Sequence, residues 1–277
     1  MIGRLKGPVI VYVAAAIVAA LFFAPILLMI VGSLKPDDLV LAEAGSWRAF
    51  VSNEISLQNY HDVFARVNYG RFMLNSLLIT STVVTLGLIV NSLFGYALAR
   101  LQWRGRNALL AVVLALMIIP FEGIAVPLFY QGTLAGWRDT YIVQIVPFIA
   151  NAFSIYLFYS FFIGLPRELE DAARVDGAGV FRTFLQVIVP SARPAFATVA
   201  ILTFLMQWSM YLWPLMVTSG ERVRPLSVAI ASFRTLPPLQ WGDIMAFGVM
   251  MVAPTLAMFL LFQRWFVRSV ITSGIKG

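Results

Sequence analysis

The chain of 277 residues is 60% hydrophobic and 12% charged and has a mean hydropathy of +0.86, which excludes an ordinary soluble domain, because such a domain is about a quarter charged. The net charge of +7 comes from 20 Lys and Arg against 13 Asp and Glu, and the bases lie between apolar stretches rather than on one basic face. This distribution favours membrane lipid over nucleic acid as a partner, and the absence of cysteine excludes disulfides and thiolate metal sites.

Six apolar segments of about 20 residues or more are predicted to cross the membrane as helices, which gives an all-α integral membrane protein with a single transmembrane domain, 1–277. The segments are 9–34, 71–99, 108–131, 141–163, 195–218 and 243–267. The first is interpreted as a retained helix rather than a signal peptide, because it is too long and no small-residue cleavage site follows it. Prolines within several segments predict bent helices.

The distribution of basic residues predicts that both termini are cytoplasmic. With that orientation, the cytoplasmic segments hold 12 Lys and Arg against 4 acids, and the outer segments hold 8 against 8. The segment 164–193 then lies in the cytoplasm, and the longest outer segment, 35–69, lies on the periplasmic side. We expect short interfacial helices in 35–69, and we expect the only histidine, His61, to be a surface residue.

A polar stretch, PRELEDAARVDGAGVFRTFLQVIVP, interrupts the apolar pattern between the fourth and fifth predicted spans. Pro166 suits a first helical position, and Glu168 and Asp171 suit the positive end of a helix dipole. Gly177 can adopt the left-handed conformation that ends a helix, and a second apolar stripe at helical spacing then runs to Pro190. The stretch is therefore predicted to form a short helix, a glycine turn and a second helix.

The first of these two helices is predicted to have a small, weakly apolar face. This face consists of Leu169, Ala172, Ala173 and Asp176. Glu170 is expected to pair with Arg174, four residues later. One interpretation is an amphipathic loop on the inner membrane surface. The net charge of −2 over 166–176 and the two adjacent alanines favour another, in which the helix enters a groove on a second protein.

The run EDAARVDGA followed by VIVP resembles the cytoplasmic signature of permease subunits of binding-protein-dependent, ATP-driven importers, which is Glu-Ala-Ala, three residues, Gly, then nine residues before Ile-x-Leu-Pro. Asp171 stands where that signature has Glu, and we expect the neighbouring Glu170 to share its role. The form ARVDGA is typical of carbohydrate importers. LQNY, NSLLI, GYALARLQWRGRN, IIPFEGIAVPLF and the final FQRWFVRSVITSGIKG are similar to the second, six-helix permease of maltose-type systems, so the resemblance covers nearly the whole chain.

This resemblance implies a type I importer permease of the bacterial inner membrane, with six transmembrane helices and a cytoplasmic coupling helix in 164–193. It implies that the coupling helix seats in a cleft on the ATPase through Glu170, Asp171, Ala172, Ala173, Asp176, Gly177 and Phe181. It also implies that the tail residues Ser273, Gly274 and Lys276 reach the ATPase, for which fraying of the terminus is the alternative. The implied partners are a homologous second permease in a heterodimer, a dimer of ATPases that carries ATP and Mg²⁺, and an extracytoplasmic solute-binding protein.

Three residues are candidates for the translocation path. Glu122 lies in an apolar run between Pro120 and Pro127, and an ionisable residue at membrane depth is a functional candidate by default. The alternative for Glu122 is pairing with the backbone or with a base of the partner permease. Trp208 and Tyr211 have aromatic faces that suit sugar rings, although such residues also serve as packing or as an interfacial belt. We expect them to shape the cavity without setting its specificity.

The sequence contains no phosphate-binding loop, nucleophile motif or metal-ligand cluster. We therefore expect that the chain is not an enzyme, that it holds no cofactor or metal, and that ATP hydrolysis belongs to a separate subunit. The predicted function is the permeation of a sugar, oligosaccharide or related polyol delivered by a periplasmic or lipid-anchored binding protein. The alternatives are an importer of a glycerol phosphoester, an ion-coupled secondary transporter and a membrane scaffold. A single intramembrane acid and the lack of an internal repeat weigh against the secondary transporter.

Overall fold

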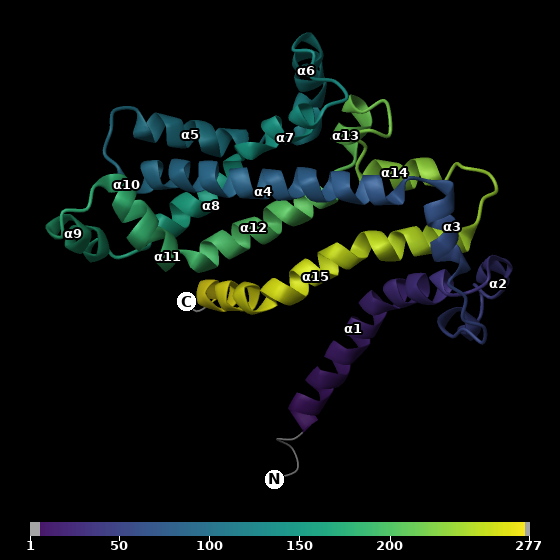
Figure 1. Cartoon of the computed structure of the whole chain (residues 1–277). Helices are drawn as coiled ribbons and strands as arrows, with labels where there is room; N and C mark the ends of the chain where they lie inside the picture. Colours follow the sequence, from purple (N-terminus) through teal and green to yellow (C-terminus); the bar gives the residue numbers. More distant parts are fainter. Residues whose placement is uncertain (1–5, 275–277) are drawn as a thin grey trace. The chain divides into compact units, whose positions relative to one another are not determined.

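The computed structural model describes the backbone of residues 6–274 and the side chains of residues 9–261, and this part of the chain is helical and contains no strand. Figure 1 shows the helices along the chain. Their bounds are α1 Lys6–Ser33, α2 Asp37–Ala42, η1 Trp47–Phe50, α3 Gln58–Arg66, α4 Tyr69–Arg100, α5 Arg106–Leu116, α6 Phe121–Leu134, α7 Tyr141–Ile149, α8 Ala152–Ile163, α9 Glu168–Val175, α10 Val180–Thr183, η2 Phe184–Ile188, α11 Val189–Ser191, α12 Arg193–Trp208, α13 Leu212–Val217, α14 Leu226–Phe233 and α15 Trp241–Gly274. The predicted all-α class is confirmed.

Four helices of the described part are long and apolar enough to cross a membrane, and the number rises to six if each of two bent pairs is one span. The four are Val9–Ser33, Tyr69–Arg100, Tyr141–Ile163, which joins α7 and α8, and Trp241–Leu261. The bent pairs are α5 with α6, at 103°, and Val180–Ser191 with α12, at 79°. Length and composition of the helices thus agree with a membrane-embedded chain.

Proline explains the bend between α5 and α6. Pro120 is the N-cap of α6, with φ −68° and ψ 144°, and the residue before a proline is pushed out of the helical conformation. The chain therefore leaves α5 and starts α6 in a new direction at Phe121. The predicted fifth span, 195–218, is also divided, because α12 ends at Trp208 and α13 begins at Leu212.

The chain divides into two compact units, of which unit 1 consists of Met1–Gly70 with Ala229–Pro254, and unit 2 of Arg71–Val228 with Thr255–Gly277. In unit 1 the predicted outer segment 35–69 contains three short helices, α2, η1 and α3, as expected. His61, on α3, is 77% exposed, which confirms that it is a surface residue. The position of these short helices at a membrane interface stays a prediction.

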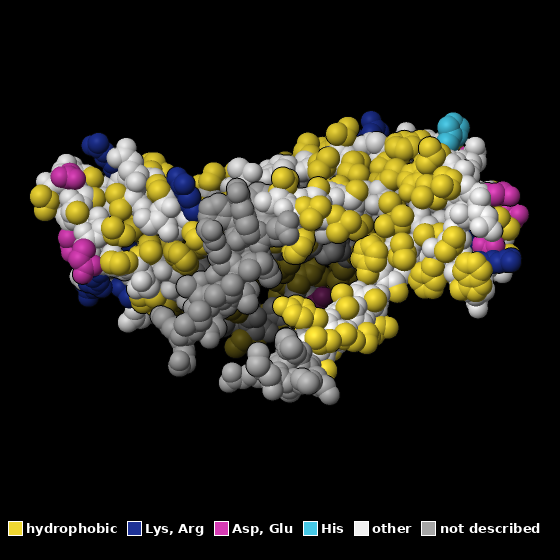
Figure 2. All heavy atoms as spheres, turned by 90° about the horizontal axis from the view of Figure 1, so that it is seen from below, with side chains coloured by type: hydrophobic (Ala, Val, Ile, Leu, Met, Phe, Trp, Pro, Cys, Tyr) yellow, Lys and Arg dark blue, Asp and Glu magenta, His cyan; other side chains and the backbone are white. Residues whose placement is uncertain are grey.

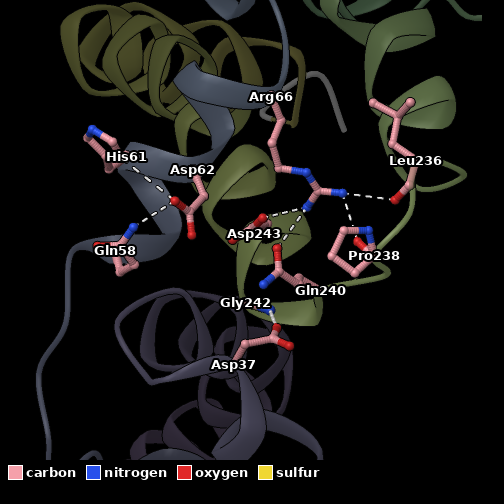
Figure 3. A network of polar contacts seen from close by, with 10 residues as sticks. All are labelled: Asp37, Gln58, His61, Asp62, Arg66, Leu236, Pro238, Gln240, Gly242 and Asp243. Carbon is pink, nitrogen blue, oxygen red and sulfur yellow. Dashed lines mark hydrogen bonds and ion pairs between the residues drawn. The ribbon is translucent and has the colours of Figure 1, made fainter.

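A buried ion pair holds α3 of unit 1 against the start of α15 (Figure 3). The carboxylate of Asp243 is fully buried, and Arg66 Nη1 lies 2.6 Å from its Oδ2. The same guanidinium donates to the Gln240 side chain at 3.1 Å and to the carbonyl oxygens of Leu236 and Pro238 at 2.8 and 2.7 Å. One arginine therefore fixes the loop before α15 as well as the helix itself, and its charge compensates the burial of Asp243.

The first turn of α15 is also capped by a residue of α2, another helix of unit 1. The Gly242 N–H donates to Asp37 Oδ1 at 2.7 Å (Figure 3), which satisfies one of the free amide groups that every helix N-terminus presents. The negative charge of Asp37 also suits the positive end of the helix dipole.

The apolar core of unit 2 joins α4, α8, η2 and α12. Its buried members are Tyr96, Ala99, Phe158, Phe162, Phe184, Ile188, Ala192, Ala195 and Val199. A polar residue, Asn91, completes the packing at the break between α7 and α8. Its side chain donates to the Ile149 carbonyl at 3.0 Å and accepts from the Asn151 N–H at 2.9 Å. Backbone groups freed by the break are thereby paired, as a non-aqueous environment requires.

We predict that Gly95→Ala destabilises unit 2, because α4 and α8 approach each other closely at this glycine. A Cβ atom there would lie 2.6 Å from Phe158 Cβ and 3.0 Å from the Tyr159 backbone nitrogen, so the helices would have to move apart. Overpacking of this kind costs about 1–3 kcal/mol. The check is the apparent melting temperature of the purified protein in detergent.

Gly87→Ala is the matched control for Gly95→Ala. It lies on the same helix, and its added Cβ would meet neighbouring atoms at 3.4 Å, which is ordinary contact. We expect Gly87→Ala to be neutral or mildly stabilising, since glycine in a helix interior costs about 0.5–1 kcal/mol relative to alanine. Equal melting temperatures for the two variants would contradict the prediction.

Candidate docking site in the segment 164–193

The polar segment folds as a helix, a glycine turn and a second helix, as predicted. The first helix, α9, begins at Glu168, two residues after Pro166, and has Glu168, Glu170 and Asp171 in its first turn. These acids suit the positive end of the helix dipole. In Figure 1, α9 and α10 lie at the end of α4 that leads into α5, and this end of α4 belongs to unit 2 together with α5, α9 and α10.

Gly177 ends α9 in the left-handed conformation, with φ +75°, which confirms the prediction made for it. The Ala178 N–H donates to the Ala173 carbonyl at 2.9 Å, and the Gly177 N–H donates to the Arg174 carbonyl at 3.0 Å. This pair of hydrogen bonds is the Schellman motif, in which a left-handed residue after the helix allows its last carbonyls to be satisfied. The direction in which the chain leaves α9 therefore depends on a glycine.

The second helix contains a π-helical turn, η2, between α10 and α11. Thr183, Phe184 and Ile188 point into unit 2, whereas Phe181 and Leu185 are exposed. The predicted stripe of apolar residues at helical spacing is thus divided between the two faces. A π turn adds a residue to the helical turn and so changes the face on which the following residues lie.

The small face predicted for α9 is exposed at Leu169, Ala172 and Asp176, as contact with a partner requires, but its fourth member, Ala173, is buried. The other buried residue of α9 is Glu170. The expected pairing of Glu170 with Arg174 is wrong, because Arg174 Nη1 lies 3.3 Å from Asp171 Oδ1 on the exposed side. Glu170 turns inward instead, toward the guanidinium of Arg100 at the end of α4, whose opposite charge lowers the cost of burying the carboxylate.

The remaining candidate docking residues are exposed. We define the docking surface as Asp171, Ala172, Val175, Asp176, Gly177 and Phe181. Figure 2 shows acidic and hydrophobic side chains side by side at the left-hand end, where α9 lies. Val175, which the sequence reasoning did not single out, is 89% exposed at the last turn of α9. The signal that would have indicated it is a β-branched apolar residue at the end of an otherwise polar helix.

The candidates for the translocation path occupy different environments. Glu122 is exposed near the start of α6. Trp208 is buried, stacks on Phe204 with 5.4 Å between ring centroids, and lines a cavity of about 10 Å³ with Gln144 and Gln207. Tyr211 is exposed in the break between α12 and α13. The cavity beside Trp208 is large enough for about one water molecule and too small for a sugar.

The predicted tail contacts are only partly covered by the structure. The backbone of Ser273 and Gly274 forms the end of α15, and their side-chain environment is not described, while Lys276 lies outside the described residues. Among the described residues, no group of three or more His, Asp or Glu side chains is arranged to hold a metal ion.

Comparison with known proteins decides the family. The sequence profile of the family described as "Binding-protein-dependent transport system inner membrane component" matches residues 84–272, which include the whole 164–193 segment. The chain belongs to this family. It is thus an inner-membrane permease component of a binding-protein-dependent transport system, as the resemblance in the segment predicted.

Two relatives match this permease along almost its whole length. The arabinooligosaccharides transport system permease protein AraQ of Halalkalibacterium halodurans is 32% identical over 95% of this chain and 94% of the relative. The trehalose/maltose transport system permease protein MalG of Thermococcus litoralis is 29% identical over 97% of each chain. These matches confirm the predicted likeness to maltose-type permeases.

A solved structure has the same fold. A chain of a bacterial ABC transporter involved in the import of the acidic polysaccharide alginate superposes with a TM-score of 0.83, covering 95% of this permease and 97% of that chain. The sequence identity is 24%. The predicted type I importer permease fold is therefore confirmed, and the described helices of both units belong to it.

Proposed function

We propose that this permease forms part of an ATP-driven importer of a sugar, oligosaccharide or related polyol. The observation that carries the proposal is the docking surface, an exposed acidic and apolar patch at the end of unit 2, in a chain of a binding-protein-dependent transport family. The carbohydrate class is supported by relatives named for arabinooligosaccharides and for trehalose and maltose.

The docking surface is proposed to seat in a cleft on a separate ATPase subunit. Asp171 and Asp176 would offer charge to basic residues, and Val175 and Phe181 would enter apolar pockets, the arrangement by which a helix binds in a groove. ATP and Mg²⁺ belong on the ATPase. Closure of two ATPases on ATP would move α9 with its surroundings, and the difference in contacts between the two states would bias the permease from inward-facing to outward-facing.

The remaining partners and the orientation complete the proposal. A homologous second permease forms the path together with this chain as a heterodimer, and an extracytoplasmic binding protein delivers the solute. Both termini and the segment 164–193 face the cytoplasm, with six spans. This orientation is supported by the excess of basic residues on one side of the predicted spans.

Transport in proteoliposomes tests the proposal. The permease is reconstituted with the second permease, the ATPase and the binding protein encoded beside it, and uptake of radiolabelled arabino-oligosaccharides, maltose and sn-glycerol 3-phosphate is measured. We expect sugar uptake only when ATP is enclosed with the ATPase and the binding protein is present outside. The matched control is an ATPase that lacks its catalytic carboxylate.

The other outcomes each replace a part of the proposal. Uptake that persists with the inactive ATPase and follows an ion gradient would identify a secondary transporter. ATP-dependent uptake of sn-glycerol 3-phosphate but of no sugar would replace the carbohydrate class while retaining the importer. An assembled complex that transports nothing would favour a scaffold.

A further inference from the structure

One acid of α9 does not belong to the exposed docking surface. Glu170 is 6% exposed, and its Oε1 lies 3.9 Å from Nε of Arg100, the last residue of α4. Counted over the side chains alone, 8% of Glu170 and 4% of Arg100 is exposed, so both side chains are buried. A carboxylate in such a position is costly unless a cation compensates it, and Arg100 supplies that positive charge.

Arg100 also binds the chain that leads into α9. Its Nη2 donates to the carbonyl oxygen of Leu165, three residues before the helix begins. A single guanidinium therefore contacts both the entry to α9 and the first turn of α9. Because Arg100 ends α4, which is long enough to cross the membrane, this contact connects the segment 164–193 directly to a spanning helix.

The attachment of α9 is otherwise slight. Its other buried residue is Ala173, whereas the following helix is anchored in the apolar core by Phe184 and Ile188. Between α9 and α4 lies a cavity of about 140 Å³, lined in part by Tyr96, Arg100, Glu170 and Thr183. The side of α9 that faces α4 is therefore not tightly packed.

The pair is not fully closed in this structure. Arg100 Nε and Glu170 Oε1 are buried, and neither has a hydrogen-bond partner among the described residues. Their separation of 3.9 Å is longer than the roughly 2.7–2.9 Å of a charge-assisted hydrogen bond. Buried polar atoms without partners are uncommon and call for a reason.

We propose that Glu170 and Arg100 are positioning residues that transmit movement of α9 to α4. Their ion pair closes when the ATPase displaces α9. This inference rests on the proposed docking of α9 on an ATPase. It assigns Glu170 a role different from docking, because its carboxylate faces α4 rather than the partner. Loss of the pair should leave the ATPase bound and active but should separate ATP hydrolysis from transport.

The experiment uses the complete reconstituted complex with Glu170→Gln, Arg100→Gln and the double variant. Three quantities are measured: the ATPase that co-purifies with the permease, solute-stimulated ATP hydrolysis, and solute uptake. We expect normal co-purification and a rise of about fivefold or more in ATP hydrolysed per solute transported, the size of a typical coupling between sites. The double variant should behave like either single variant, because residues that act through one contact are not additive.

Two controls separate this role from general effects of charge. Glu168→Gln removes an exposed carboxylate from the same helix, and Arg104→Gln removes an exposed guanidinium just beyond α4. Both should keep the wild-type ratio of ATP to solute. If a glutamine variant does not fold, as judged by size-exclusion chromatography, Glu170→Asp carries the test, since it retains the charge but shortens its reach and should also raise the ratio.

The results that overturn the inference differ from those that overturn the proposed function. A wild-type ratio in all folded variants, or effects of the single variants that multiply in the double variant, would overturn the role of the pair. Loss of the ATPase from the Glu170→Gln complex would place Glu170 in the docking contact instead. Wild-type complex that shows no solute-stimulated hydrolysis would contradict the proposed function before any variant is compared.

Discussion

Gly177→Val should abolish most of the transport activity while leaving the permease folded. At φ +75° a residue with a side chain is strained by about 1–2 kcal/mol, and a β-branched residue is among the least tolerant. A Cβ at Gly177 would meet no atom within 4 Å, so we expect the effect to come from the backbone conformation rather than from a clash at this carbon. Since one to two kcal/mol changes an equilibrium by about 5–30-fold, we expect solute uptake and solute-stimulated ATP hydrolysis to fall together by that factor.

Two variants make this result specific to the turn. Gly179→Ala lies two residues away, at φ −72°, where alanine is unstrained and its Cβ would also meet nothing within 4 Å. Gly177→Asn introduces a side chain that accepts the left-handed conformation. We expect both to retain most of the uptake. If Gly177→Asn were as inactive as Gly177→Val, the left-handed turn would not be the cause.

Arg66→Ala should be the most destabilising single substitution in unit 1. It leaves the fully buried carboxylate of Asp243 without its cation. It also removes the hydrogen bonds that Arg66 donates to the carbonyl oxygens of Leu236 and Pro238. Breaking a buried ion pair by removing one partner costs about 3–5 kcal/mol. We expect a lower yield of folded protein and a lower apparent melting temperature in detergent, measured by size-exclusion chromatography after heating.

The control and the rescue for Arg66→Ala are both available in the chain. Arg71→Ala removes an exposed arginine five residues later and should leave the melting temperature unchanged. Replacing both charges, with Arg66→Met and Asp243→Leu, should recover part of the loss, because the unpaired charge is then gone. A double variant less stable than Arg66→Ala would show that the loop contacts of Arg66 matter more than the charge.

The features that could be predicted from sequence are local ones. Apolar runs indicated the long helices, and Gly177 indicated the left-handed turn because glycine is the residue that adopts this conformation freely. The exposed position of Asp171 and Asp176 also follows from their charge. In each case the evidence lies within a few residues of the feature.

The features that sequence reasoning missed depend on residues distant along the chain. Helical spacing and hydrophobicity assigned Glu170 to the outside, whereas in the structure it points inward, toward Arg100, 70 residues earlier. The ion pair of Arg66 with Asp243 joins residues 177 positions apart. A periodic pattern cannot indicate such partners, because it compares only neighbours on one helix.

Grafting the docking surface onto another permease would require more than the surface itself. All of its residues lie within eleven consecutive positions, from Asp171 to Phe181, and the turn that shapes it depends on Gly177 within the same stretch. The recognition residues and the turn that shapes them therefore lie in one short block of sequence. The attachment behind it is not local, because the buried Glu170 faces Arg100 at the end of α4. A functional graft would therefore have to carry two separate pieces of sequence, one for recognition and one for Arg100.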